Sequence, residues 1–171
     1  MKKAFTVIEL LVVLVILLLL IGITVPVYMR ATERGRATAC ISNLRQLGIA
    51  LDLYLGEHNQ TMPTLAAARS SATQDMPVID NTLSAYASNP NVFACPSDFQ
   101  GIAAATGTSY YWNSALNGQA VANLNFFAMA DVSQIPVLSD KQSFHPYSQN
   151  KINLLYADGH ATQDSKFFTS Q

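Results

Sequence analysis

The chain has 171 residues, of which half are hydrophobic, and a formal net charge of −1. This length suits one modest globular domain together with a membrane-associated segment. The nearly neutral charge excludes the strongly basic surface that nucleic-acid-binding proteins present, so no nucleic-acid partner is expected.

An almost unbroken apolar run occupies the first thirty residues. Between positions 10 and 25, only Gly22 and Thr24 interrupt the leucines, valines and isoleucines. As a helix, the apolar stretch 5–27 would be roughly 35 Å long, which is enough to cross the hydrocarbon core of a bilayer. Two lysines precede it and three arginines follow it, so the flanking charges do not by themselves fix its orientation.

A cleaved secretory signal is the alternative interpretation of this stretch. Such a signal has an apolar core of about 7–15 residues followed by small residues at the cleavage site. Here the apolar run is longer, and the first small-x-small candidate, Ala37-Thr38-Ala39, lies beyond the basic cluster. A transmembrane span is therefore the prediction.

Glu9 is the one carboxylate within the apolar run. An unpaired charge in lipid costs at least ~2.5 kcal/mol, so such a residue usually has a partner. The simpler interpretation places Glu9 at the level of the lipid headgroups. Alternatively, a cut between Ala4 and Phe5 would create an α-amino group near Glu9, and in a bundle of such helices the amine of one subunit would neutralise the carboxylate of another.

The segment Lys-Lys-Ala-Phe-Thr-Val-Ile-Glu-Leu-Leu-Val-Val at 2–13 resembles the leader and helix start of type IV pilins and type II secretion pseudopilins. The resemblance implies a leader peptide, 1–4, that a prepilin peptidase removes by cutting between Ala4 and Phe5. It further implies N-methylation of Phe5 and a role for Glu9 in assembly. Family members usually have Gly before the cut, so Ala4 departs from the pattern. Pro26 matches a common family position, where it kinks the helix.

The same resemblance implies a cellular location and a set of binding partners. It implies a single-pass protein of the bacterial inner membrane, with a cytoplasmic N-terminus and a head domain that is periplasmic or, after assembly, extracellular. The implied partners are further copies and other pilin-like subunits in a filament, the peptidase, the inner-membrane assembly platform and membrane lipid. The sequence does not distinguish a pilus from a secretion pseudopilus. The alternative function is a membrane-anchored ligand- or metal-binding module that forms no filament.

No enzymatic activity is expected. The sequence has no Gly-rich phosphate loop, no Gly-x-Ser-x-Gly motif and no Cys-x-x-Cys pair.

Helical periodicity resumes after Pro26. Apolar residues recur at spacings of four, three, four and three, and therefore line one face of a helix: Cys40, Leu44, Leu47, Leu51 and Tyr54. The helix is expected to run to about Leu55 and end at Gly56. The expected organisation is thus a transmembrane or filament-core helix at 5–28, an amphipathic stem helix at 29–56 and a globular head at 57–171.

Two cysteines, Cys40 and Cys95, are far apart in the chain. In an exported domain, such a pair favours a disulfide that closes a long loop and contributes about 3–4 kcal/mol. Two buried free thiols are the alternative.

The head is predicted to be mixed. Short helices are expected at 65–69 and from Asp80 or Asn81 to Tyr86. β-strands are expected at 108–112, 126–129, 135–138 and 151–156, with a hairpin turn at Asp158-Gly159. The fold class is therefore α+β, with a long N-terminal helix packed by its C-terminal half on an antiparallel sheet of three to five strands, as in pilins.

Four polar residues of the last third are candidates for chemistry: Asp140, His145, Asp158 and His160. Two Asp and two His side chains can form a metal site or a His–carboxylate pair for acid–base work. The favoured interpretation is structural, since a turn already accounts for Asp158-Gly159. No cofactor is expected, and calcium bound by Asp131, Asp140 or Asp158 is the one candidate.

The ending Leu154-Leu-Tyr-Ala-Asp-Gly-His160 is similar to that of pilin-like proteins in which a His precedes Asp-Gly by about nine residues. Here twelve residues separate His145 from Asp158, so the spacing departs from that group. The aromatic run Tyr110-Tyr111-Trp112 has two interpretations, a stacking platform for sugar or nucleic acid and, preferably, a strand with alternating buried and exposed rings.

Overall fold

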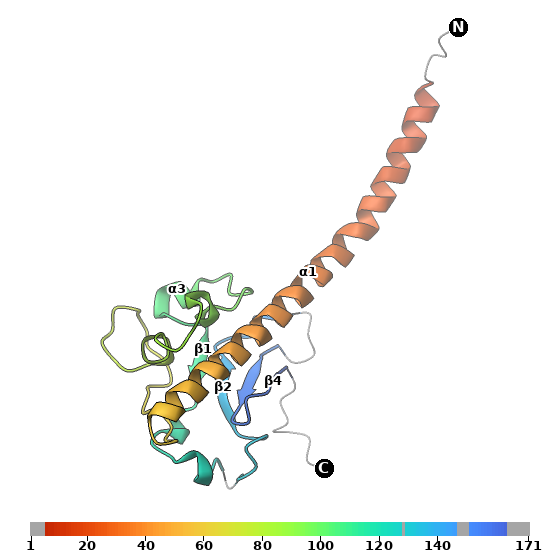
Figure 1. The fold of residues 1–171 in the computed structure, drawn as a ribbon. Coiled ribbons are helices and arrows are strands. Elements are labelled where there is room, and N and C mark those ends of the chain that lie inside the picture. Colours follow the sequence, from red (N-terminus) through yellow and green to blue (C-terminus); the bar gives the residue numbers. More distant parts are fainter. Residues whose placement is uncertain (1–5, 128, 147–150, 164–171) are drawn as a thin grey trace.

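The computed structural model describes residues 6–127, 129–146 and 151–163. One helix, α1 (Val7–Glu57), is 51 residues long and organises the molecule. Its first half projects alone, and its second half is embedded in a small head domain (Figure 1). An α+β fold with a long N-terminal helix on an antiparallel sheet is therefore confirmed.

Thr6 and Glu9 form a capping box at the start of α1. The backbone N–H of Glu9 donates to Thr6 Oγ1 at 3.3 Å, and the backbone N–H of Thr6 donates to Glu9 Oε2 at 2.9 Å. These bonds satisfy two backbone donors that have no partner inside the helix.

Pro26 lies inside α1 without ending it. Because proline has no N–H, the carbonyl of Gly22 four residues earlier loses its helical partner. The hydroxyl of Thr24 bonds back to the carbonyl of Leu20 at 2.7 Å, a contact that often bends helices. The helix is drawn as one continuous, gently curved ribbon (Figure 1).

The predicted stripe on the second half of α1 is the inward face of the head. Cys40, Leu44, Leu47 and Leu51 are buried, and Tyr54 is half-buried. The helix passes Gly56 by one residue, and the chain then reverses through Asn59 and Gln60, both with positive φ.

Four short strands form an antiparallel sheet in the order β1-β2-β3-β4. The strands are β1 (Tyr110–Trp112), β2 (Pro136–Asp140), β3 (Leu154–Tyr156) and β4 (Ala161–Thr162). The predicted hairpin at Asp158-Gly159 is confirmed, because it joins β3 to β4 and Gly159 has the positive φ, 83°, that such a turn requires.

The sheet packs through β3 and β4 on α1. Gly48 lies close to β3, since a Cβ added to it would lie 3.2 Å from a methyl group of Leu155. The core between helix and sheet includes large, fully buried side chains, among them Leu44, Leu47, Tyr110, Trp112 and Leu138.

Several smaller predictions were wrong. Residues 65–69 form no helix, because their backbone bonds to distant parts of the head: Asn117 bonds both the N–H and the carbonyl of Leu65, and Trp112 N–H donates to the carbonyl of Ala67. The second predicted helix is only α2 (Ile79–Thr82). Phe126 and Met129 make one isolated bridge rather than a strand.

The remaining elements were not predicted from the sequence: η1 (Pro90–Phe93), α3 (Ile102–Thr106), η2 (Ser114–Leu116) and η3 (Val121–Asn123). All are at most five residues long, too short to produce a periodic signal.

Candidate metal centre

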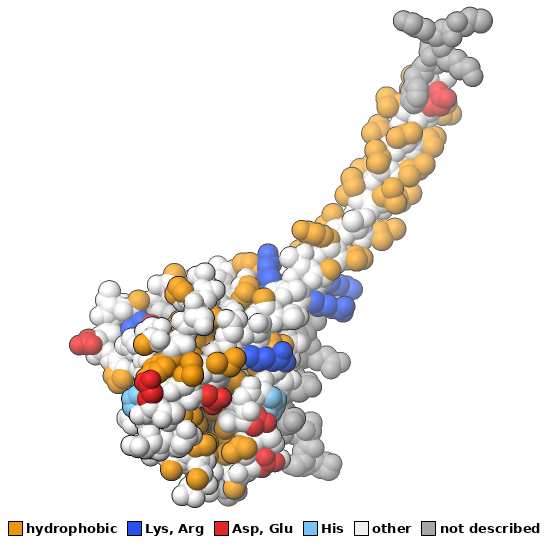
Figure 2. Space-filling view, in the orientation of Figure 1, with side chains coloured by type: hydrophobic (Ala, Val, Ile, Leu, Met, Phe, Trp, Pro, Cys, Tyr) orange, Lys and Arg blue, Asp and Glu red, His pale blue; other side chains and the backbone are white. Residues whose placement is uncertain are grey.

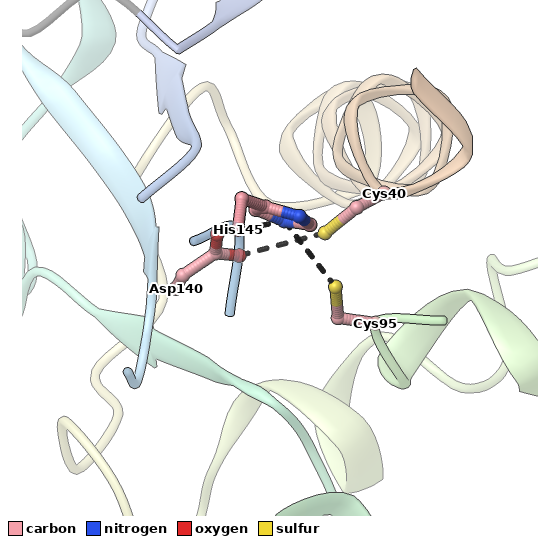
Figure 3. Close-up of side chains that lie close together, drawn as sticks. All are labelled: Cys40, Cys95, Asp140 and His145. Atoms are coloured by element: carbon pink, nitrogen blue, oxygen red, sulfur yellow. Dashed lines mark hydrogen bonds and ion pairs between the residues drawn. The ribbon is translucent and has the colours of Figure 1, made fainter. Parts of the chain in front are cut away.

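Four potential metal ligands meet beneath the second half of α1: Cys40, Cys95, Asp140 and His145 (Figure 3). One ligand atom from each residue lies within 4.8 Å of the others. All four residues are buried, with exposed fractions of 0%, 3%, 4% and 1% respectively. Among the described residues, this cluster is the one group of three or more such side chains that close together.

Each side chain comes from a different part of the fold. Cys40 belongs to the inward stripe of α1, and Cys95 follows η1. Asp140 is the last residue of β2, and His145 lies in the segment after it. Three regions that are distant in the chain therefore converge on one point.

Backbone hydrogen bonds hold the cluster in place. The N–H of Cys95 donates to Ser109 Oγ at 3.0 Å, next to the start of β1. Asn153 donates its N–H to Asp140 Oδ2 at 2.7 Å and accepts the N–H of Asp140 at 3.1 Å. Both partners, Ser109 and Asn153, are completely buried.

The distances within the cluster are short. The thiol of Cys40 donates to Asp140 Oδ1 at 3.5 Å, and Cys95 Sγ lies 3.6 Å from His145 Nε2. His145 Nε2 is also 3.5 Å from Asp140 Oδ2 and 2.7 Å from the side-chain amide of Asn153. Tyr110 Oη lies 3.3 Å from Cys40 Sγ.

Glu33 holds the far side of the imidazole. Its Oε1 lies 3.3 Å from His145 Nδ1 and accepts a 2.6 Å hydrogen bond from the hydroxyl of Ser97. Arg36 reaches the other oxygen at 3.4 Å. Glu33 is 6% exposed, so it is a buried carboxylate with three partners.

Without a bound cation, Cys40 and His145 keep their protons. The hydrogen bond to Cys95, burial and the negative charge of Asp140 raise the pKa of Cys40. Burial by itself would lower the pKa of His145, but Asp140 and Cys40 outweigh burial and raise this pKa to about 10. The Cys40 thiol is therefore a weak nucleophile, and a cation that binds its sulfur must displace its proton.

The arrangement suits a closed structural site. Two sulfurs, one nitrogen and one carboxylate oxygen are a donor set that zinc accepts, and a structural zinc site has four protein ligands with no open position. A catalytic metal needs an open position for substrate, and the burial of all four residues leaves little room for one.

The predicted pairing of the two cysteines is confirmed only as proximity. Both Cys40 and Cys95 are free thiols in the structure, which is the alternative that the sequence left open. The two sulfurs lie within 4.8 Å of each other but are not bonded. The disulfide itself therefore stays a prediction.

The four polar candidates of the last third separate into two groups. Asp140 and His145 join the cysteines, whereas Asp158 pairs with His160 at the β3–β4 turn, where Asp158 is exposed. The turn role expected of Asp158 is supported by its acceptance of the His160 N–H at 3.1 Å.

The aromatic run at 110–112 is a strand with alternating rings, as preferred. Tyr110 and Trp112 are buried, and only Tyr111 is exposed, at 44%. A flat stacking platform needs adjacent exposed faces, so that interpretation was wrong.

Sequence reasoning missed Glu33, Ser97 and Asn153. Glu33 had a usable signal, because it continues the inward stripe of α1: Glu33, Ala37, Cys40 and Leu44 follow the same alternating spacing of four, three and four. A carboxylate on an otherwise apolar inward face predicts a buried polar partner. Ser97 and Asn153 carried no such signal.

The processing residues Ala4 and Phe5 lie outside the described residues. Glu9 is exposed and accepts hydrogen bonds from the backbone and the hydroxyl of Thr6, at 2.9 and 2.8 Å. Within one chain, Glu9 is thus a helix cap.

Comparisons with protein-family models, with curated proteins and with solved structures yield no match for this chain.

Proposed function

We propose that this protein is a prepilin-like structural subunit, anchored in the bacterial inner membrane by the first half of α1 and assembled into a type IV pilus-like or type II secretion filament. The observation that supports this most is the division of α1. No residue of its most apolar 18-residue window is buried, whereas the second half of the same helix forms the core of the head.

The exposed half of α1 needs an apolar environment. Every residue from Val7 to Met29 is exposed in the single chain, and apolar side chains cover the stem on the visible face (Figure 2). Removing each large aliphatic side chain from water contributes about 1.5–3 kcal/mol. Lipid and a bundle of neighbouring stems both satisfy this requirement, and the proposed subunit uses them in turn.

The boundary between the two halves carries positive charge. Arg30 and Arg34 are exposed where the stem meets the head, and blue side chains lie on both sides of the junction in the view of Figure 2. Arginines at this level suit contact with anionic lipid headgroups. These arginines favour a membrane-spanning segment that ends close to Arg30.

Glu9 connects the anchor with assembly in this proposal. After cleavage between Ala4 and Phe5, the new α-amino group of one subunit pairs with Glu9 of its neighbour. This pairing competes with the hydrogen bonds that Glu9 accepts from Thr6 within its own chain. The pairing stabilises the subunits more in lipid than in water, because placing an unpaired carboxylate in lipid costs about 2.5 kcal/mol or more.

The second candidate is a membrane-anchored metal-binding module that forms no filament. It is favoured by the buried cluster of Cys40, Cys95, Asp140 and His145. The two candidates differ at the N-terminus, because only the filament subunit requires processing.

The deciding measurement is the intact mass and N-terminal residue of the full chain isolated from native membranes. A chain that starts at N-methylated Phe5 supports the filament subunit. A chain that still starts at Met1 means that Ala4 prevents the cut, and the anchored module then becomes the better proposal.

A pair of substitutions separates the charge of Glu9 from its capping role. Glu9→Gln keeps an oxygen for the capping box but removes the charge, whereas Glu9→Ala removes both and costs the helix about 1 kcal/mol. We expect both variants to insert normally and to lose assembly to the same extent, measured as sheared or cross-linked filament. Normal assembly of Glu9→Gln would rule out carboxylate–amine pairing.

A further inference from the structure

We propose that Cys40, Cys95, Asp140 and His145 bind one Zn²⁺ ion that fastens α1 to the head domain. This inference does not depend on filament assembly, since all four ligands belong to one chain. Its residues meet where the second half of α1 packs on the head (Figure 3), whereas Glu9 and the apolar stem belong to the first half of the helix.

The distances between ligand atoms match those of a tetrahedral zinc site. With Zn–S bonds of about 2.3 Å and Zn–N or Zn–O bonds of about 2.1 Å, tetrahedral geometry separates sulfur from nitrogen or oxygen by about 3.6 Å. The separation is 3.5 Å between Cys40 Sγ and Asp140 Oδ1 and 3.6 Å between Cys95 Sγ and His145 Nε2. Nitrogen and oxygen should lie about 3.4 Å apart. His145 Nε2 is 3.5 Å from Asp140 Oδ2, the other oxygen of the same carboxylate, so binding of the ion through a single oxygen requires the Asp140 carboxylate to turn.

The donor types select zinc over the calcium considered from the sequence. Calcium and magnesium take oxygen ligands almost exclusively, and here two of the four donors are sulfur. Thiolate and imidazole donors in a tetrahedral arrangement are typical of zinc. The three anionic ligands also compensate the charge of the ion within a buried site.

Glu33 acts as the positioning residue for His145. It accepts from Nδ1 at 3.3 Å, which directs Nε2 toward Cys95 and Asp140. Zinc-bound imidazoles usually donate their second N–H to a carboxylate in this way. Ser97 and Arg36 hold Glu33 in turn, so the orientation of the ring is supported from outside the cluster.

A surface groove lies next to residues that neighbour the cluster. A groove of about 380 Å³ beside the start of the head is lined in part by Glu33 and by Pro146, the residue after His145. The ion must displace the amide of Asn153 from its 2.7 Å contact with Nε2. Loading therefore involves local rearrangement next to β3.

The same two sulfurs would form the disulfide predicted for an oxidising compartment. The two states exclude each other, because disulfide formation removes two electrons and both thiol protons and leaves no thiolate to bind the metal. The proposal commits to zinc, because Asp140 and His145 complete a four-ligand set that a disulfide would not need.

The first test is metal analysis of the full chain, purified in mild detergent without added chelator. We expect about one zinc per chain and two thiols that react only after the zinc is removed. Replacement of zinc by Co²⁺ should give the visible bands of a tetrahedral site and a thiolate-to-cobalt charge-transfer band. A metal-free chain that binds neither ion after reduction, or one that retains a Cys40–Cys95 disulfide and cannot be loaded once reduced, would overturn the proposal.

Variants assign the ligands. His145→Gln and Cys95→Ser should lose stoichiometric zinc, whereas the matched control His160→Gln at the β3–β4 turn should retain it. Glu33→Gln, which keeps the shape of the side chain, should weaken zinc affinity about 10- to 100-fold while the tetrahedral cobalt spectrum persists. If a ligand variant fails to fold, the cobalt spectrum of the unaltered chain still decides, because a missing thiolate band excludes the cysteines as ligands. Equal zinc loss in His160→Gln would also contradict the proposed ligand set.

Discussion

The two halves of α1 belong to one uninterrupted helix, but they meet different surroundings. In the first half, apolar side chains point in every direction, and residues such as Leu17 are exposed in the single chain. In the second half, apolar side chains recur on one face, and Leu44 and Leu47 are completely buried against the head. A helix that is apolar all round needs lipid or other helices, whereas an apolar stripe needs one packed partner. The pattern of apolar residues, and not their number, therefore separates the exposed half of α1 from the half that forms the core.

The largest expected effect tests this division directly. Leu44→Ala should lower the free energy of unfolding of the head by about 2–5 kcal/mol, because it leaves a cavity between α1 and the sheet. Leu17→Ala, the same change in the exposed half, should alter it by no more than about 0.5 kcal/mol. Denaturant unfolding of the full chain in mild detergent, followed by the fluorescence of Trp112, reports on the head, since Trp112 is the only tryptophan and is buried. Equal losses in the two variants would mean that the halves of α1 are not energetically separate.

A smaller effect is expected at Gly107, which lies against the half-buried ion pair of Arg69 and Asp80. Gly107 has φ of 91°, and a Cβ added there would collide with the paired side chains of Arg69 and Asp80. Gly107→Ala should therefore destabilise the head by about 1–3 kcal/mol. The control is Gly101→Ala, which also has positive φ, 69°, but has open space around the added methyl group. In the same fluorescence assay, the control should lose clearly less free energy of unfolding than Gly107→Ala. A larger loss in the control would show that the Arg69 and Asp80 side chains can move away from the added methyl group at no cost in stability.

The smallest effect concerns Asp98, which organises the start of α3. Burial by itself would raise its pKa, but hydrogen bonds from the N–H groups of Ala103 and Ile102 and from the hydroxyl of Ser109 lower it below the ordinary value of 3.8. The folded-state pKa is thus below the unfolded one. The contribution of Asp98 to stability is fully present above the unfolded value and is lost as the pH falls through the folded one.

Asp98→Asn should accordingly reduce the stability of the head by about 1 kcal/mol near neutral pH. The difference from the unaltered chain should shrink below pH ~4 and vanish once both side chains are uncharged. Unfolding curves recorded over this pH range provide the measurement, with exposed Asp75→Asn as the control. A difference that stays constant as the pH falls would exclude the charge of Asp98 as its source.

Parts of the head show how far local sequence signals reach. The strands at 110–112, 136–140 and 154–156 lie within or close to the predicted segments, because β-prone residues and the Asp158-Gly159 turn act locally. The predicted helix at 65–69 is missing, because the side chain of Asn117 bonds the backbone of Leu65. Tertiary hydrogen bonds thus overrode a weak helical propensity in a short segment.

The set of residues in the candidate metal centre was only partly predicted from the sequence. The proximity of Cys40 and Cys95 was expected from the inward stripe, but Asp140 and His145 were grouped with Asp158 and His160 instead. The sequence offers no compact ligand motif, because the ligands come from α1, the segment after η1, the end of β2 and the segment that follows it.

By itself, the sequence determined the long helix, the boundary between its exposed and packed halves, and the β-hairpin near the end of the chain. Each of these follows from residue periodicity or turn chemistry over a few neighbouring positions. Only the tertiary structure decided which polar side chains meet, as the contact between Glu33 and His145 joins residues 112 positions apart. The physical reason is that burial forces polar groups to find partners wherever the packed chain places them, and their separation along the sequence has no part in that choice.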